Sequence, residues 1–350
     1  MEKISIIIEN LYFSVYPTCK RELAYAIFNV RSFRAEKGRV FMKKQYFSVQ
    51  EDGFYGCYYP VPSGSKCALI GMLGDAVDDY LAMSFVKWLL PQGCNVMAMA
   101  PAKKDYGHHN LPLERFEHAI HWLKSQGIER IAIAGGSTTG MLALIAASYY
   151  ADISLTVAFS PSDFVMEGYY QGKKDGAKEW PGQGESTVSY QGKPVPYLPF
   201  AYRHPEYWQQ IQAESKQTKN MIASRALFDE SERRHPLQEQ ERIKVERIQG
   251  KIVFIGAEDD CLWDTCRYIR RMQERLAQYQ APSTAEYLLY EHGTHFIFPD
   301  SMLTKALPLL SGFFVGRCFQ AARDYPKECK ATRIDIDRRL RKILADWINA

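Results

Sequence analysis

The sequence predicts an α/β fold, with a mostly parallel central sheet flanked by helices. From residue 67 onward, short apolar runs alternate with amphipathic stretches of helical period. This alternation is typical of right-handed βαβ units and hence of a parallel sheet. Several of the apolar runs end in turns that carry glycine and reactive side chains. In a parallel sheet such turns gather at one edge, where ligands bind.

Each predicted element follows from its local pattern. Residues 46–60 alternate in strand fashion around Glu51-Asp-Gly53, which predicts a hairpin. Residues 332–348 place apolar side chains at helical spacing, which predicts a final amphipathic helix that packs on the body. The remaining predicted strands are 67–73, 94–100, 130–134, 154–159, 251–256 and 285–290, and the remaining helices are 79–90, 113–125, 265–277 and 301–314.

The alternation stops between residues 161 and 244. Because this stretch leaves the end of a strand at the ligand edge, we expect it to form a lid or cap over the site. The core is then 51–160 with 245–322, preceded by an N-terminal extension (1–50) packed on it and followed by a C-terminal helix (323–350). Aromatic side chains of the insertion are candidates for an acyl pocket or for packing inside the lid: Tyr169, Tyr170, Trp180, Tyr197, Phe200, Tyr202, Tyr207 and Trp208.

Composition excludes several classes of protein. The net charge of the 350 residues is +4, and residues 323–342 alone carry eight Lys/Arg against four Asp/Glu, a difference of +4. The body is therefore nearly neutral and offers no field for nucleic acid. No apolar run approaches the ~20 residues of a membrane span, and the first residues do not resemble a signal peptide. Eight cysteines without a C-x-x-C spacing predict reduced thiols. We expect a cytoplasmic protein.

The segment Gly135-Gly-Ser-Thr-Thr-Gly140 lies between an apolar run and a helix-forming run. A serine on a sharp strand-to-helix turn is how a sheet enzyme presents an exposed nucleophile. The glycines permit a strained backbone, and the helix N-terminus supplies oriented N–H dipoles. Ser137 taken alone is equally explained as a helix N-cap.

An acid and a histidine follow in order, each after a later strand. Glu258, Asp259 and Asp260 come after the run 251–256, and His292-Gly-Thr-His295 comes after the run 285–290. The order Ser…Asp…His is that of the α/β-hydrolase fold. Spacing does not separate neighbours, so Asp259 competes with Asp260 and His292 with His295.

A tetrahedral oxyanion needs two backbone donors. One is expected from Thr138, the residue after the serine, and the other from Asp75 or Ala76 in the loop after the strand 67–73. No cofactor or metal is expected, because His108 and His109 beside Asp105 have no third ligand at a suitable spacing.

With these residues in view, residues 51–299 resemble the C-terminal domain of the acyl-CoA thioester hydrolase/bile-acid-CoA:amino-acid N-acyltransferase family, relatives of dienelactone hydrolases. The resemblance implies an α/β-hydrolase in which Ser137 is the nucleophile, Asp260 the acid and His295 the base. Besides the serine turn it is carried by Tyr190-Gln-Gly-Lys-Pro-Val-Pro-Tyr-Leu-Pro199, Val245-Glu-Arg-Ile-Gln-Gly250, Glu258-Asp-Asp-Cys-Leu-Trp-Asp-Thr265 and His292-Gly-Thr-His295.

The chain departs from the family pattern in three places. Thr139 stands where the family has glycine, and Ser137 stands where the amino-acid-conjugating branch has cysteine. The N-terminal β-sandwich of the animal enzymes does not fit before residue 51. The resemblance therefore implies hydrolysis of an acyl ester or thioester, with acyl-CoA among the candidates, through an acyl-enzyme. The alternatives are acyl transfer to an amine or alcohol, and a non-catalytic binding module. Acyl length and oligomeric state are not predicted.

Overall fold

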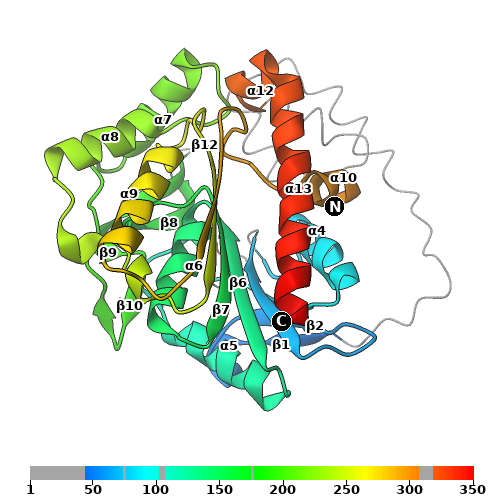
Figure 1. Ribbon diagram of the computed structural model, residues 1–350. Helices are drawn as coiled ribbons and strands as arrows, with labels where there is room; N and C mark the ends of the chain where they lie inside the picture. The colour runs from blue at the N-terminus through cyan, green and yellow to red at the C-terminus, as the bar shows by residue number, and fades with distance from the viewer. Residues whose placement is uncertain (1–43, 74–75, 102–106, 175–176, 307–317) are drawn as a thin grey trace. The chain divides into compact units, whose positions relative to one another are not determined.

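The computed structural model describes residues 44–73, 76–101, 107–174, 177–306 and 318–350 (Figure 1). Its centre is an eight-stranded sheet of order β1-β2-β4-β3-β6-β7-β12-β13. All neighbours from β4 to β13 are parallel, and β2 is antiparallel to both of its neighbours. The predicted fold class is confirmed. The strands are β1 (Gln45–Phe47), β2 (Gly56–Tyr59), β3 (Cys67–Met72), β4 (Asn95–Met99), β6 (Arg130–Gly136), β7 (Ile153–Phe159), β12 (Lys251–Ala257) and β13 (Ala285–Tyr290).

Helices cover both faces of the sheet, which explains why its central strands are apolar on both sides. One face packs against α5 (Glu114–Ser125), α6 (Thr138–Tyr149) and α9 (Thr265–Gln278). The other packs against α4 (Tyr80–Leu89), α10 (Asp300–Ala306) and α13 (Pro326–Asn349). The predicted docking of the last helix is confirmed, because its apolar side chains are buried: Ile336, Leu340, Ile343, Leu344 and Trp347.

The predicted first hairpin is the antiparallel pair β1–β2. Its turn contains a one-turn helix, α3 (Val49–Asp52), in which the Ser48 hydroxyl accepts the Glu51 N–H at 3.2 Å. Gly53 ends this helix with φ of +78°, a conformation that favours glycine. Of the predicted N-terminal extension (1–50), residues 45–47 thus belong to the sheet and residues 49–50 to α3, while residues 1–43 lie outside the described residues.

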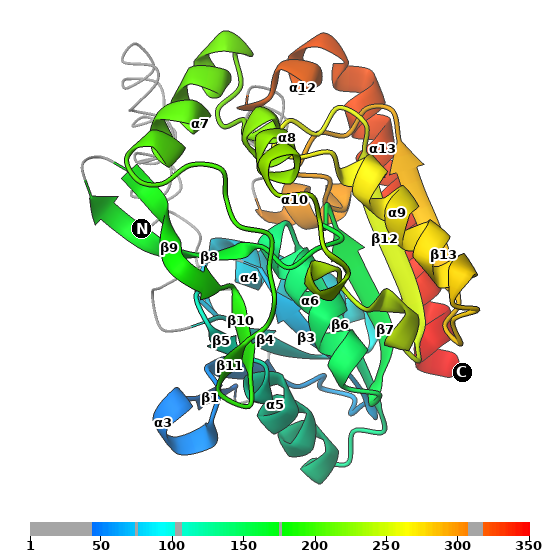
Figure 2. The ribbon, with the colours of Figure 1, turned by 90° about the vertical axis from the view of Figure 1, so that its left-hand side faces the viewer.

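The insertion between β7 and β12 has its own elements (Figure 2). The strands β8 (Glu167–Lys174) and β9 (Ala177–Ser186) form an antiparallel hairpin. The short strand β10 (Val188–Tyr190) lies between β11 (Lys193–Pro194) and β5 (Leu111–Pro112). Two helices follow, α7 (Glu206–Gln217) and α8 (Arg225–Arg234).

Some of the aromatic side chains of the insertion pack against one another within it. Phe200 lies 5.2 Å from Tyr207 and 5.7 Å from Phe228 between ring centroids, and all three are buried. For these residues the structure favours packing within the lid over lining a pocket.

A buried ionic cluster joins the two ends of the insertion. Asp163, near its start, pairs with Arg242, near its end, at 3.3 Å and with Arg271 of α9 at 2.5 Å. The Ile243 N–H also donates to the Asp163 carbonyl at 3.0 Å. Asp163 is only 3 % exposed, and this burial raises the pKa of its carboxyl to about 6, although the two arginines oppose the rise.

We expect this carboxyl to make stability depend on pH. Its folded-state pKa lies above the ordinary 3.8, so its stabilising contribution is complete below about pH 4 and is lost as the pH rises through about 6. The variant Asp163→Asn cannot titrate there. The free energy of unfolding of the native chain, relative to that of D163N, should therefore fall by up to ~3 kcal/mol between pH 4 and pH 7. Urea melts of both proteins across this range measure the difference. A constant or rising difference would contradict the assignment.

The cysteines that the structure describes are free thiols: Cys57, Cys67, Cys94, Cys261, Cys266, Cys318 and Cys329. Cys19 lies outside the described residues. Within the described ranges, every helix is too short or too polar to cross a lipid bilayer.

Candidate active site

Ser137 is the single residue between β6 and α6. Its backbone has φ of +61° and ψ of −132°, a conformation that is costly for any residue except glycine and that occurs at functional turns. The side chain is partly exposed and makes no capping hydrogen bond to the helix. Ser137 thus occupies the N-cap position of α6, but capping by its hydroxyl does not explain why a serine stands there.

Asp260 and His295 form a buried pair in the loops that follow β12 and β13. The imidazole Nδ1 lies 2.8 Å from Asp260 Oδ2 and 3.0 Å from Oδ1, and the two side chains are at most 1 % exposed. The same carboxylate accepts the Leu262 N–H at 2.9 Å and the Thr265 hydroxyl. Because an ionised carboxylate only accepts hydrogen bonds, Nδ1 carries the proton and Nε2 is left with a lone pair.

His295 Nε2 is buried and has no hydrogen-bond partner among the described residues. The edge of the ring meets Trp263 at 4.7 Å between centroids with an interplanar angle of 85°. Trp263 lies three residues after Asp260, and the sequence pattern alone indicated no role for its side chain. The tryptophan restricts the imidazole on one side and leaves the basic nitrogen without a competing donor.

The rival residues form a second pair. Asp259 lies 3.3 Å from His292 Nδ1, and its other oxygen accepts the N–H groups of Gly293 and Thr294 at 3.1 and 2.8 Å. His292 stacks on Tyr325 at 3.8 Å. The adjacent carboxylates thus serve different histidines: Asp260 contacts the ring of His295, whereas Asp259 holds the turn that leads to it.

The serine and the buried pair lie at one edge of the sheet. The Ser137 N–H donates to the Phe159 carbonyl at 2.8 Å, and the next residue, Ser160, donates through its hydroxyl to the His295 carbonyl at 3.0 Å. Two adjacent residues, Phe159 and Ser160, therefore hydrogen-bond to the backbone of Ser137 and of His295, respectively. Within the described residues no hydrogen bond joins Ser137 Oγ to His295 Nε2. Such bonds are often long before substrate binds.

The predicted oxyanion donors differ in availability. The Thr138 N–H is in the first turn of α6 and has no acceptor among the described residues. The Ala76 N–H, in contrast, donates to Asp79 Oδ2 at 3.1 Å, and Asp79 also caps α4 through Ala82 N–H at 2.9 Å. In this structure the Ala76 N–H is thus engaged by a carboxylate, and its role as an oxyanion donor stays a prediction. Asp75 lies outside the described residues and stays a prediction.

The metal interpretation of the adjacent histidines has no support in the described part of the chain. His108 Nδ1 lies 2.9 Å from the Tyr169 hydroxyl, and His109 stacks on Tyr170 at 4.1 Å. Asp105 lies outside the described residues, and those that are described contain no group of three side chains suited to a metal ion.

Comparison with known proteins identifies the family. Residues 111–304, more than half of the chain, match the model of the BAAT / Acyl-CoA thioester hydrolase C terminal family. The chain belongs to this family. It is an α/β-hydrolase-fold enzyme of the esterase and thioesterase type. No curated protein matches the chain.

Solved structures with a similar chain trace share little sequence with it. The Pyrococcus furiosus esterase Pf2001 is 14% identical, with a TM-score of 0.43, over 90% of this chain and 100% of that one. MGS-M1, an α/β hydrolase from a Medee basin deep-sea metagenome library, is 14% identical, with a TM-score of 0.48, over 87% and 98%. Est1E from Butyrivibrio proteoclasticus is 12% identical, with a TM-score of 0.40, over 79% and 99%.

In this member of the acyl-CoA thioester hydrolase family, the turn between β6 and α6 remains tight although Thr139 replaces glycine. A side chain at Gly135 would meet the Thr139 carbonyl at 2.1 Å, and one at Gly140 would meet the Phe159 carbonyl at 2.7 Å, so these two positions need glycine. Thr139 contributes its hydroxyl instead. That oxygen accepts the Gly136 N–H at 3.0 Å and lies 2.7 Å from the Met72 carbonyl at the end of β3.

We expect the Thr139 hydroxyl to hold the turn against the strand that leads to the oxyanion loop. Thr139→Val keeps the shape but leaves buried groups unpaired, which costs ~1–3 kcal/mol. The melting temperature should fall, and kcat should fall about tenfold if the turn shifts. Thr139→Ser should retain both. Thermal melts and steady-state kinetics of the two variants check this, and equal behaviour of valine and serine would contradict it.

The insertion packs directly on the acid loop. The N–H groups of Ser224 and Arg225 donate to the Cys261 carbonyl at 3.1 Å, and the Ser224 hydroxyl donates to the Leu262 carbonyl at 2.9 Å. Phe228 of α8 lies 5.1 Å from Trp263, the residue that meets His295. Helix α8 of the insertion is thus connected to the imidazole of His295 through Phe228 and Trp263.

Proposed function

We propose that the chain is a serine hydrolase that cleaves an acyl ester or thioester through an acyl-enzyme. Ser137 is the nucleophile, His295 the general base and Asp260 the residue that orients the imidazole. The observation that supports this most strongly is the buried Asp260–His295 pair, whose Nε2 lone pair is unused. It lies at the same edge of the sheet as a serine with a strained backbone.

The reaction then proceeds in two halves. Ser137 Oγ attacks the carbonyl carbon of the substrate while its proton moves to His295 Nε2. The Thr138 N–H and a second donor from the loop after β3, predicted at Asp75, stabilise the resulting oxyanion. Collapse expels the alcohol or thiol, which takes the proton from His295. Water repeats the sequence on the acyl-enzyme and releases the carboxylic acid.

The insertion is proposed as the lid of this site. Its contacts with Cys261, Leu262 and Trp263 link it to the acid loop and to the base. A lid in this position excludes water from the ester and shapes the space for the acyl group.

The test is a turnover assay with paired substrates. Acyl esters of p-nitrophenol and the matching thioesters of coenzyme A and N-acetylcysteamine report release of the phenol or thiol. We expect release that is first order in enzyme, together with one equivalent of free acid. If added amines or alcohols capture the acyl group in preference to water, acyl transfer replaces hydrolysis. If no substrate is turned over by well-folded protein, the chain is a binding module.

A further inference from the structure

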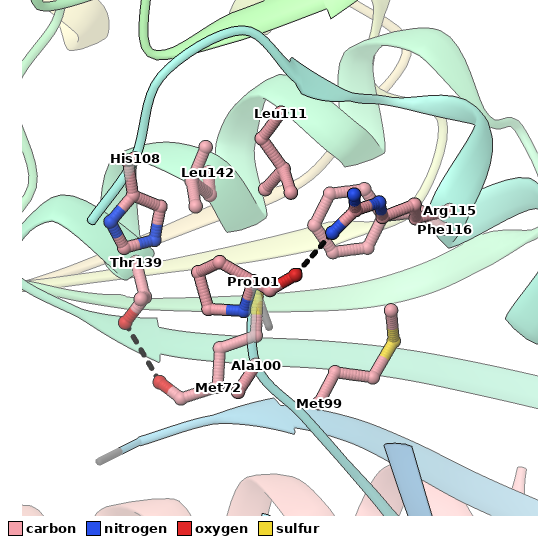
Figure 3. A pocket seen from close by; sticks show the side chains of 10 residues that line it. All are labelled: Met72, Met99, Ala100, Pro101, His108, Leu111, Arg115, Phe116, Thr139 and Leu142. Carbon is pink, nitrogen blue, oxygen red and sulfur yellow. Dashed lines mark hydrogen bonds between the residues drawn. The ribbon is translucent and has the colours of Figure 1, made fainter. Parts of the chain in front are cut away.

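A narrow pocket lies beside the serine turn (Figure 3). Met72 at the end of β3, Pro101 after β4, and Thr139 and Leu142 of α6 all contribute to its wall. Thr139 is two residues from Ser137, so the pocket borders the turn that carries the proposed nucleophile, although Ser137 itself is not one of its lining residues. The pocket is partly open, and its interior space is about 10 Å³, that of about one water molecule, so a larger group would meet its wall at the mouth and a long hydrocarbon chain does not enter.

Arg115 places a positive charge in the wall of this mostly apolar pocket. Its guanidinium is partly buried and donates to the Pro101 carbonyl, and within the described residues no carboxylate forms an ion pair with it (Figure 3). Burial lowers the pKa of this guanidinium, yet an arginine keeps its charge in proteins. By contrast, Arg271 and Arg275 each bridge two carboxylates.

The position of Arg115 in its helix makes its positive charge still less favourable. It is the second residue of α5, where the helix dipole disfavours a cation. The neighbouring Glu114 forms no ion pair with Arg115 within the described residues, and its carboxylate accepts the Gln191 N–H at 2.6 Å. A partly desolvated charge without a counter-charge is unfavourable, and an anion bound beside it would offset that cost.

We propose that Arg115 is a specificity-determining residue that binds an anionic group of the substrate. The inference rests on the proposed hydrolase function and narrows its substrate class to esters or thioesters that carry a carboxylate or a phosphate. The guanidinium of Arg115 has five N–H donors and uses one for the Pro101 carbonyl, so the others can donate to two oxygens of such a group. The anion belongs either to the far end of the acyl group or to the leaving group.

The test compares charged and neutral substrates on matched variants. Hemi-esters of succinate and glutarate with p-nitrophenol carry an acyl carboxylate, and butanoate and pentanoate esters are their neutral counterparts. Acyl-CoA and the acyl thioester of N-acetylcysteamine differ in the phosphates of the leaving group. The variants are Arg115→Met, Arg115→Lys and, as control, Arg130→Met. Arg130 also donates to a backbone carbonyl, that of Trp347 at 2.7 Å, but starts β6 at the opposite end from Ser137.

The expected result is a selective loss. Arg115→Met should lower kcat/KM for the anionic substrates by about 10- to 100-fold, the value of a charge-assisted hydrogen bond, and leave neutral substrates within about twofold. Arg115→Lys should recover part of the loss, and Arg130→Met should change neither class. Loss on the hemi-esters assigns the anion to the acyl group, and loss on acyl-CoA assigns it to the leaving group.

Two results would overturn the inference: a native enzyme with no preference for either anion, or an equal loss on charged and neutral substrates. Both require that the neutral esters are hydrolysed. Should the native enzyme hydrolyse no substrate of either class, the proposed function itself fails, and that outcome is distinct. Thermal melts of each variant verify that the fold is retained.

Discussion

Replacing Ser137 with alanine should lower kcat for acyl esters by about 10⁵-fold or more, because no other group supplies the attacking oxygen. The fold should be kept, since the Ser137 hydroxyl makes no hydrogen bond to the helix that it precedes. Steady-state assays and circular dichroism of Ser137→Ala measure the two effects.

A second substitution at the same position tests the backbone strain. Ser137→Gly should be equally inactive but more stable, by about 1 kcal/mol, because glycine accepts φ of +61° without cost. Full activity in Ser137→Ala would refute the nucleophile. A glycine variant that is less stable than the alanine variant would refute the strain.

Substitutions of the two adjacent aspartates should differ in their effect on kcat by three to four orders of magnitude. Asp260→Asn turns the acceptor of His295 Nδ1–H into a group that can donate, so the imidazole loses the correct tautomer, and kcat should fall about 10⁴-fold. Asp259→Asn retains a carbonyl oxygen for the Gly293 and Thr294 N–H groups, so kcat should fall less than about tenfold.

The alanine variant at 259 is the matched control for the role of the turn. Asp259→Ala removes the oxygen that accepts both N–H groups and should lower kcat more than Asp259→Asn does, through misplacement of His295. Equal losses in Asp259→Asn and Asp260→Asn, measured as kcat at fixed pH with saturating ester, would contradict the division of labour between the two acids.

The strands and their mostly parallel arrangement were predictable because buried parallel strands appear in the sequence as apolar runs separated by helical periods, whereas the order of the strands in the sheet was not predicted. The predicted strand 285–290 matches β13, and the helix 113–125 differs from α5 by one residue. The insertion was harder: its hairpin β8–β9 is rich in Gly, Lys and Gln and lacks clear alternation. Only its position after β7 indicated a link to the site.

The candidate site residues were proposed from their order along the chain, whereas the contacts around them could not be predicted. The glycines of the strand-to-helix turn were visible in the sequence, but the close approach that requires Gly135 and the hydrogen bonds of the Thr139 hydroxyl with Met72 and Gly136 are seen only in the structure. Likewise, Ala76 loses its donor to a capping aspartate three residues away. Arg115 could not be found from sequence, because an arginine with no carboxylate partner is recognised only when its surroundings are known.

In the proposed mechanism, Ser137 Oγ is the nucleophile and His295 activates it. Treating the folded protein with an alkyl fluorophosphonate and mapping the modified peptide by mass spectrometry tests this most directly. We expect one adduct, on Ser137, which is absent in Ser137→Ala and forms at least about a hundredfold more slowly in His295→Ala. An adduct on another residue, no adduct at all, or labelling that is indifferent to His295 would contradict it.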